Sequence, residues 1–385
     1  MKERAIEWLD TKEVSPFECE DPFNNNNKLS GFMCTKPDHR YGALIIFQVN
    51  DESCEQVIFG TPKLHYPFDK QGTYKWPDIQ EVKVWDKLDG TNILAYRYIY
   101  KGQEYVTYKT RLTPVAKDST LVSFRSMWIE YTSENPWIHE LIMMNPEFNL
   151  SFELFGSRNP ITIRYEVPLD VNFLFGVRRK DSAIKPPDLL KLPDGTKLPS
   201  SFGATIPSSK EVLTDWYNIF RSSMSAKNKE SLITEGMVLY AHVGEPSWRM
   251  FKCKPEEIEK IHWAASGSIP MLILKNTAVN AFEDKENPTV EDLETLLLEE
   301  FAQDIINKSR LKIKKVWDWA NEHMLLVKTV NDVWGKAKAE GFDVTKDKDQ
   351  TMRFMSKYFP KGMMQKVGTI VLKQAGLIKE KEKHR

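Results

Sequence analysis

The sequence has little of what marks a secreted or membrane protein. It contains four cysteines, scattered without paired spacing, which argues against a disulfide framework or a cysteine-rich zinc site. No run approaches the ~18 consecutive apolar residues of a membrane span, and the first residues lack the apolar core of a signal peptide. We therefore expect an intracellular, cytoplasmic protein with reduced thiols and no membrane partner.

An excess of charge of either sign is also missing. Lys and Arg together number 54, as do Asp and Glu, so the formal net charge is zero. Net charge thus neither favours nor excludes a nucleic-acid partner, and any basic binding surface must be local. The seven histidines form no ligand cluster. At 385 residues, the chain is long enough for two or three domains with their own cores.

Three regions of different composition follow one another along the chain. Residues 1–78 are rich in turn formers and predict a β-rich N-terminal region, with strand-like runs at 42–49 and 56–59. Residues 79–256 alternate between strand-like and helical runs, and residues 257–385 are predicted to be helical. The helices expected in this last region span residues 290–307, 311–340, 346–358 and 361–376. The pattern indicates an α+β protein.

The most informative stretch is residues 87–90, Lys-Leu-Asp-Gly, which lies where one strand-like run ends and the next begins. A lysine amine becomes a nucleophile when desolvation or a nearby cation lowers its pKa. Glycine allows a close backbone approach that a side chain would block. The pattern is short and built from common residues, so its meaning depends on partners supplied by the rest of the chain.

Two such partners follow along the sequence. A hairpin is predicted over residues 93–110, turning at 101–103, and it returns Arg111 to the neighbourhood of Lys87. Residues 148–156 then alternate cleanly between apolar and polar side chains, so Glu153 projects away from the apolar face of its strand. Arg111 and Glu153 are therefore candidates for the same site as Lys87.

Further along, three more charged side chains suit the same chemistry. Glu235 begins a strand, and Lys252 and Lys254 have the same parity on the next one, so both lysines face one way. Carboxylates can hold a divalent cation or a ribose hydroxyl, and clustered lysines suit a polyphosphate. The set fits attack of Lys87 on a nucleotide α-phosphate with a stabilised pyrophosphate leaving group.

These residues belong to five short motifs that follow one another in a fixed order. They are residues 87–90 (Lys-Leu-Asp-Gly), 152–156 (Phe-Glu-Leu-Phe-Gly), 172–175 (Asn-Phe-Leu-Phe), 235–238 (Glu-Gly-Met-Val) and 252–254 (Lys-Cys-Lys). The set resembles the motifs of the covalent nucleotidyltransferases, which comprise ATP-dependent polynucleotide ligases and mRNA capping enzymes. Among them the chain most resembles the RNA ligases, of the phage tRNA-repair or the archaeal RNA-circularising kind.

The resemblance implies an ATP-dependent RNA ligase that joins RNA 5′-phosphate and 3′-hydroxyl ends through lysyl-AMP and RNA-adenylate intermediates. It implies ATP and Mg²⁺ or Mn²⁺ as cofactors and RNA as partner. It also implies a homodimer and is compatible with a phage-encoded protein. The expected architecture is an antiparallel-sheet, ATP-grasp-like nucleotidyltransferase core in residues 79–256. A β-rich lead-in of residues 1–78 precedes this core, and a helical C-terminal domain of residues 257–385 follows it.

Carried onto this sequence, the resemblance gives the charged candidates their roles. Lys87 would form the lysyl–AMP adduct, while Lys252 and Lys254 would contact the α-phosphate and activate the leaving group. Glu235 would be a carboxylate on the metal side. Glu153 would bind the ribose and stand next to the metal.

The remaining candidates would contact the nucleotide. Asp86 would lie by the adenine edge and Asp89 within the nucleotide site. Asn92 would position the metal or the phosphate, and Arg111 would bind phosphate.

An aromatic ring from the third motif would stack on the adenine. Phe175 is the first candidate, and Phe173, predicted to lie on the same side of the strand, is the second. Many members of the superfamily follow this aromatic residue with aspartate, whereas Gly176 stands here, which leaves the register of the strand open.

Other interpretations remain open from the sequence. Phe173 and Phe175 can be core residues, and the Lys-rich helix at 311–340 can be a solvated face. A DNA ligase or a GTP-using capping enzyme would share the motifs but would carry strands after residue 256. A non-catalytic RNA-binding relative, or an unrelated protein with chance motifs, are further alternatives.

Overall fold

The computed structural model describes most of the chain. The described residues are 1–69, 72–118, 123–159, 163, 165–202, 209–228, 234–244, 248–255, 269, 271–284, 288–298, 301, 303–375 and 377. They divide into two compact units, one formed within the part of the chain up to residue 255 and the other within the part from residue 269 onward. Helices combine with antiparallel sheets, as the predicted α+β class requires.

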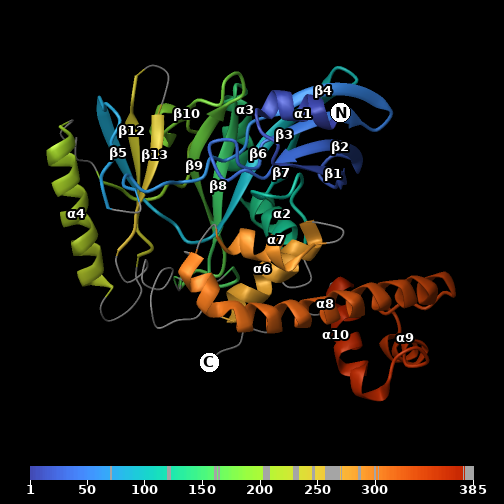
Figure 1. Cartoon of the computed structure of the whole chain (residues 1–385). Helices are drawn as coiled ribbons and strands as arrows, with labels where there is room; N and C mark the ends of the chain where they lie inside the picture. Colours follow the sequence, from blue (N-terminus) through green and yellow to red (C-terminus); the bar gives the residue numbers. More distant parts are fainter. Residues whose placement is uncertain are drawn as a thin grey trace. The chain divides into compact units, whose positions relative to one another are not determined.

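The N-terminal region forms a four-stranded antiparallel sheet in the order β1-β2-β3-β4, beside a short helix (Figure 1). Its elements are α1 (Lys2–Leu9), β1 (Val14–Asp21), β2 (Asn27–Cys34), β3 (Leu44–Val49) and β4 (Glu52–Ile58). Apolar side chains of this sheet, such as Leu29 of β2 and Ile46 of β3, pack in one buried cluster with Tyr96 and Tyr98 of the next sheet. The lead-in is therefore attached to the rest of its unit through an apolar core.

The second sheet has five strands in the order β10-β9-β8-β6-β7. They are β6 (Thr91–Tyr100), β7 (Gln103–Lys109), β8 (Phe148–Phe155), β9 (Asp170–Arg178) and β10 (Ile184–Lys185). The hairpin between β6 and β7 turns at Lys101 and Gly102, whose φ angles are 50° and 75°. Two residues with positive φ form the turn that matches the twist of a hairpin, so the predicted hairpin is confirmed.

A β-bulge between β8 and β9 overturns one expectation about the aromatic candidates. Ser151 pairs with Phe175 and its neighbour Phe152 pairs with Phe173, which leaves Leu174 as an extra residue. The rings accordingly lie on opposite faces of the sheet. The prediction that Phe173 and Phe175 share a side is wrong, because the extra residue resets the alternation.

Two helices cover the face of the second sheet on which Phe173 lies. They are α2 (Phe124–Glu134) and α3 (Trp137–Met144). The ring of Phe152 lies 5.5 Å from that of Trp128 and 6.3 Å from that of Trp137, and it also contacts Phe173 at 5.5 Å. This aromatic core attaches α2 and α3 to the sheet on the face opposite to Phe175.

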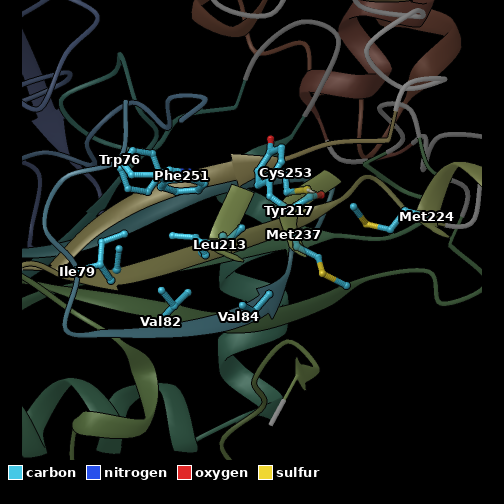
Figure 2. Packing of buried hydrophobic residues seen from close by; sticks show 12 residues of the cluster. Trp76, Ile79, Val82, Val84, Leu213, Tyr217, Met224, Met237, Phe251 and Cys253 are labelled. Atoms are coloured by element: carbon cyan, nitrogen blue, oxygen red, sulfur yellow. Dashed lines mark hydrogen bonds between the residues drawn. The ribbon is translucent and has the colours of Figure 1, made fainter. Parts of the chain in front are cut away.

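The third sheet runs in the order β11-β5-β12-β13. Its strands are β5 (Glu81–Asp86), β11 (Ser201–Phe202), β12 (Met237–His242) and β13 (Trp248–Cys253), and helix α4 (Lys210–Lys227) accompanies them. Met237 of β12 packs with Leu213 and Tyr217 of α4, as Figure 2 shows, and Leu239 belongs to the same buried cluster. Because side chains alternate along a strand, Val238 projects to the other face.

That other face meets the second sheet across an apolar layer. Trp85, Val238 and Tyr240 from the third sheet lie in one buried cluster with Leu94 and Phe175 from the second. The two sheets therefore face each other, and loops at their edges can bring charged groups of both sheets together.

The second unit consists of helices in its described part. They are α6 (Met271–Asp284), α7 (Val290–Leu297), α8 (Gln303–Ala339), α9 (Lys348–Met355) and α10 (Met364–Gln374), with a 3₁₀ turn at Lys361–Met363. The predicted helix at 290–307 corresponds to α7 and the beginning of α8, although residues 299, 300 and 302 lie outside the described part, and α6 was not predicted. Among the helices described, none is long and apolar enough to cross a membrane.

We predict that Leu213→Ala weakens the first unit by about 2–5 kcal/mol, because it removes a fully buried side chain between α4 and the third sheet and leaves a cavity. The matched control is Ile219→Ala on the same helix, where the side chain is 69% exposed. Denaturant unfolding of both variants tests the prediction. Equal stabilities would show that α4 does not stabilise the sheet.

Candidate active site

The site is organised around one buried carboxylate that two lysines share. Lys87 Nζ lies 2.6 Å from Glu235 Oε2, and Lys254 Nζ lies 2.8 Å from Glu235 Oε1. The side chains of Glu235 and Lys254 are each 3% exposed, whereas that of Lys87 is 20% exposed. The structure thus brings together three of the residues predicted from separate motifs, and it leaves the lysine of the first motif accessible.

Backbone geometry explains why these three side chains meet. The amide N–H of Lys87 donates to the carbonyl of Gly236 at 2.9 Å, which continues the pairing of β5 with β12. Gly236 has a φ of 141°, and a Cβ atom there would lie 2.3 Å from the carbonyl oxygen of Cys253. Glycine is therefore required at this position, where β12 begins directly against the end of β13.

The charge state of Glu235 follows from this arrangement. Burial alone would raise the pKa of Glu235, but the ammonium groups of Lys254 and Lys87 hold it below its ordinary value. Glu235 therefore stays ionised. It is suited to hold both lysines in place as a fixed negative charge.

The loop that follows Lys87 lies directly on strand β8. The amide N–H of Gly90 donates to Glu153 Oε1 at 3.1 Å. A Cβ atom at Gly90 would lie 2.4 Å from the carbonyl oxygen of Leu154, so only glycine permits this approach. The contact places Glu153 of the second sheet next to the lysine motif, which begins where β5 of the third sheet ends.

Glu153 differs electrostatically from Glu235. Burial raises the pKa of Glu153 to about 7, and the charges of Glu235 and Asp89 act in the same direction, while Lys87 and Arg111 oppose them. Arg111 therefore lies close enough to act on this carboxylate. The site holds one carboxylate that stays ionised and one that takes up a proton near neutral pH.

Lys252 faces the layer between the two sheets, where it contacts Tyr66, a residue that the sequence patterns did not identify. Its Nζ lies 4.6 Å from the centroid of the Tyr66 ring, and its amide N–H donates to the carbonyl of His65 at 2.9 Å. Tyr66 comes from the N-terminal region, in which no motif marked it. An ammonium over an aromatic face is attracted by the ring quadrupole, which fixes its position.

Asn92 and Asp89 are both engaged with neighbouring groups in the structure. The side chain of Asn92 accepts from the hydroxyl of Thr61 at 2.8 Å and donates to Ser151 Oγ at 2.7 Å. Asp89 Oδ2 accepts from the amide N–H of Ile163 at 2.6 Å. Both side chains thus tie other segments to the lysine loop.

The two outermost candidates border the site. Asp86 ends β5, where it pairs with Met237, and its amide N–H donates to the carbonyl of Ser200 at 2.8 Å. Arg111 follows β7, and its guanidinium carbon lies 5.7 Å from the centroid of the Tyr41 ring. Arg111 is thus held by the N-terminal sheet region as well as by the hairpin.

The two aromatic candidates occupy different places. Phe175 lies in the layer between the sheets, 6.3 Å from the Tyr240 ring and in the same cluster as Val238. Phe173 is fully buried against Phe152 on the opposite face, under helices α2 and α3. Of the two, Phe175 lies on the face that carries Glu153.

A divalent cation would find oxygen donors here. In the described part of the chain, no group of three or more His, Cys, Asp and Glu side chains is arranged to hold a metal. Glu153 and Glu235 do interact electrostatically, since Glu235 raises the pKa of Glu153. Mg²⁺ is commonly held by one or two carboxylates together with substrate phosphates, and Glu153 and Glu235 are carboxylates of the kind that this mode of binding uses.

We predict that Glu153→Gln changes how stability depends on pH. Because the pKa of Glu153 is raised from 4.5 to about 7 in the folded protein, this group stabilises the fold most at low pH and loses that contribution as pH rises through about 7. The loss is up to about 3 kcal/mol. When urea unfolding is measured between pH 4.5 and 7.5, the free energy of unfolding of the variant should not show this loss.

Glu166→Gln, at an exposed position of the same unit, is the matched control and should follow the original protein. If Glu153→Gln retained the full pH dependence, the carboxylate would not hold a proton near neutral pH.

No protein-family model matches the sequence, and no curated protein matches it either. Among solved structures, two forms of an archaeal ATP-dependent RNA ligase are similar. One form has 16% sequence identity and a TM-score of 0.45, and the match covers 77% of this chain and 76% of that one. The other form has 14% sequence identity and a TM-score of 0.43, and the match covers 98% of this chain and 96% of that one. A protein assigned as an ATP-dependent DNA ligase from Aquifex aeolicus has 14% identity and a TM-score of 0.40 over 98% of this chain and all of that one.

Proposed function

We propose that the protein is an ATP-dependent RNA ligase that forms a lysyl–AMP adduct. The observation that carries the proposal is the convergence of Lys87, Glu235 and Lys254 within 2.6–2.8 Å, with Glu153 bound to the same loop. These residues come from four separate motifs of the covalent nucleotidyltransferases. A partly exposed lysine among buried charged groups is a suitable nucleophile, because its neighbours fix its position and exclude most water.

The nucleotide would enter between the two facing sheets. Phe175 and Val238 belong to the apolar layer there, and we assign to them the two faces of the adenine ring. Glu153 would accept a hydrogen bond from the ribose. Lys252 and Lys254 would contact the α-phosphate, since ammonium groups bind phosphate oxygens by charge-assisted hydrogen bonds.

In the first step Lys87 Nζ loses a proton and its lone pair forms a bond to the α-phosphorus of ATP. The bond from that phosphorus to the bridging oxygen breaks, and pyrophosphate leaves with the electron pair. Glu235 Oε2, at 2.6 Å, orients the amine and is within reach of its proton. Positive charge on Lys252 and Lys254 stabilises the charge that develops on the phosphate oxygens.

Two transfers would complete the reaction. An oxygen of the RNA 5′-phosphate attacks the adenylate phosphorus and releases Lys87, and a 3′-hydroxyl then attacks the activated 5′-phosphate and releases AMP. Glu153 and Glu235 would hold Mg²⁺ or Mn²⁺, which when bound neutralises phosphate charge. We assign these steps to residues 79–256 and a role in RNA choice to residues 257–385.

The principal alternative is the same chemistry on another substrate, in a DNA ligase or a capping enzyme. Those relatives normally carry a β-rich domain after the last motif. Here the described residues from 269 to 377 are helical and include no strand, which favours the RNA ligase. A competition between 5′-phosphorylated RNA and DNA strands for release of the adenylate distinguishes the two.

We predict that Lys87→Ala and Lys87→Arg both abolish the adduct. The arginine variant keeps a positive charge beside Glu235 but lacks the nucleophilic amine. The measurement is incubation with ATP labelled at the α-phosphate and Mg²⁺, followed by a denaturing gel.

Lys75→Ala, at a mostly exposed lysine paired with Asp69, is the matched control and should label normally. An unlabelled original protein, shown to be folded and free of bound adenylate, would support a non-catalytic RNA-binding relative instead.

We also predict that Tyr66→Leu slows adduct formation by about 3- to 30-fold, since a cation–π contact is worth about 0.5–2 kcal/mol and Tyr66 positions Lys252. Tyr66→Phe keeps the aromatic face and should restore the rate. Single-turnover labelling at saturating ATP measures both variants. If Tyr66→Leu reacted as fast as the original protein, the ring would have no part in placing Lys252.

A further inference from the structure

Helix α8 carries a local excess of positive charge in a chain that is neutral overall. Residues 305–317 contain five cationic side chains and no acidic one. One of the five, Arg310, lies 3.7 Å from Glu294 of α7. The other four are lysines, and their arrangement on the helix decides what they can bind.

Three of these lysines form a single face of the helix. Lys308, Lys312 and Lys315 follow one another at intervals of four and three residues, and all three are exposed. At 3.6 residues per turn, these intervals place them within a narrow sector, about 10 Å long. We call these three lysines the basic face.

Apolar and aromatic groups continue the basic face on both sides. Leu311, between the first two lysines, is 80% exposed. Trp319 lies one turn beyond Lys315, with Lys275 Nζ 4.5 Å from its centroid and the His323 ring stacked on it at 5.2 Å. Cationic side chains interleaved with apolar and aromatic ones are typical of surfaces that bind nucleic-acid strands.

The apolar side of α8 limits the kinds of partner. Ile313, Val316 and Ala320 are buried in the core with α6 and α7, so this side of the helix is not available to enter a lipid interface. Acidic residues are absent from residues 305–317, a segment that Asp304 and Asp318 bound in the sequence. A flexible, extended polyanion therefore complements this face.

We propose that the basic face binds the phosphate backbone of single-stranded RNA. Its three ammonium groups span about 10 Å, and a nucleic-acid strand presents one phosphate per ~3.4 Å along its axis, so each lysine can reach a phosphate. Lysines on flexible stems bind phosphates without reading bases. The inference rests on the proposed function, because RNA is the substrate that it names.

The test uses the full-length protein and a 5′-phosphorylated, fluorescein-labelled single-stranded RNA, with binding followed by anisotropy from 50 to 200 mM salt. The triple variant Lys308→Ala/Lys312→Ala/Lys315→Ala should bind at least about 10-fold more weakly at low salt. Its slope of log affinity against log salt should be shallower by about 2, because three phosphate contacts are lost.

The control variant is Lys328→Ala/Lys336→Ala/Lys346→Ala, which removes the same charge from other exposed positions of the same unit. It should keep the original slope. If both triple variants changed equally, net charge and not the basic face would govern binding, which would overturn the inference. An unchanged affinity of the first variant would overturn it too and leave an acidic protein surface as the partner of this face.

Formation of the protein–AMP adduct from ATP alone separates this inference from the proposed function. The first triple variant should be labelled as fast as the original protein, because none of its three lysines belongs to the site around Lys87. Absence of the adduct in the original protein contradicts the proposed function, whereas normal labelling with unchanged RNA binding contradicts only the role of the basic face.

Discussion

The structure of the site depends on the carboxylate of Glu235, which holds two ammonium groups at once. Each of its oxygens contacts one lysine, Lys87 or Lys254, and the Glu235 side chain itself is only 3% exposed. Removing one partner of a buried ion pair commonly destabilises the fold by about 3–5 kcal/mol, so the position of each of the three side chains depends on the other two. Because Glu235 precedes the central strand β12, the pairing of β12 with β5 and β13 is what brings both lysines to it.

The second carboxylate has a different physical character. Among the described residues Glu153 has no ion pair as close as those of Glu235, and burial raises its pKa to about 7. The site therefore contains one carboxylate whose pKa is held low and one whose pKa lies near neutral pH. Two carboxylates with separated pKa values allow one to position the lysine side chains while the other adapts its charge to the group that binds beside it.

Much of this site could be predicted from the sequence, because strand periodicity fixes direction. The parity of Lys252 and Lys254, the polar side of Glu153 and the hairpin before Arg111 each follow from local pattern. The bulge at Leu174 could not be predicted, since its residue type is ordinary and the extra residue is visible only in the pairing of two strands. Tyr66 and Thr61 were missed for a related reason: each acts through a contact with a residue remote in the chain.

The segment that carries Thr61 and Tyr66 has a consequence for how the candidate site forms. His65 forms a parallel bridge with Phe251, so the earliest part of the site pairs with almost the latest. Contacts between residues so far apart in sequence close large loops, and such contacts form slowly and late in folding. A nascent chain therefore holds an incomplete candidate site until strand β13 has been synthesised.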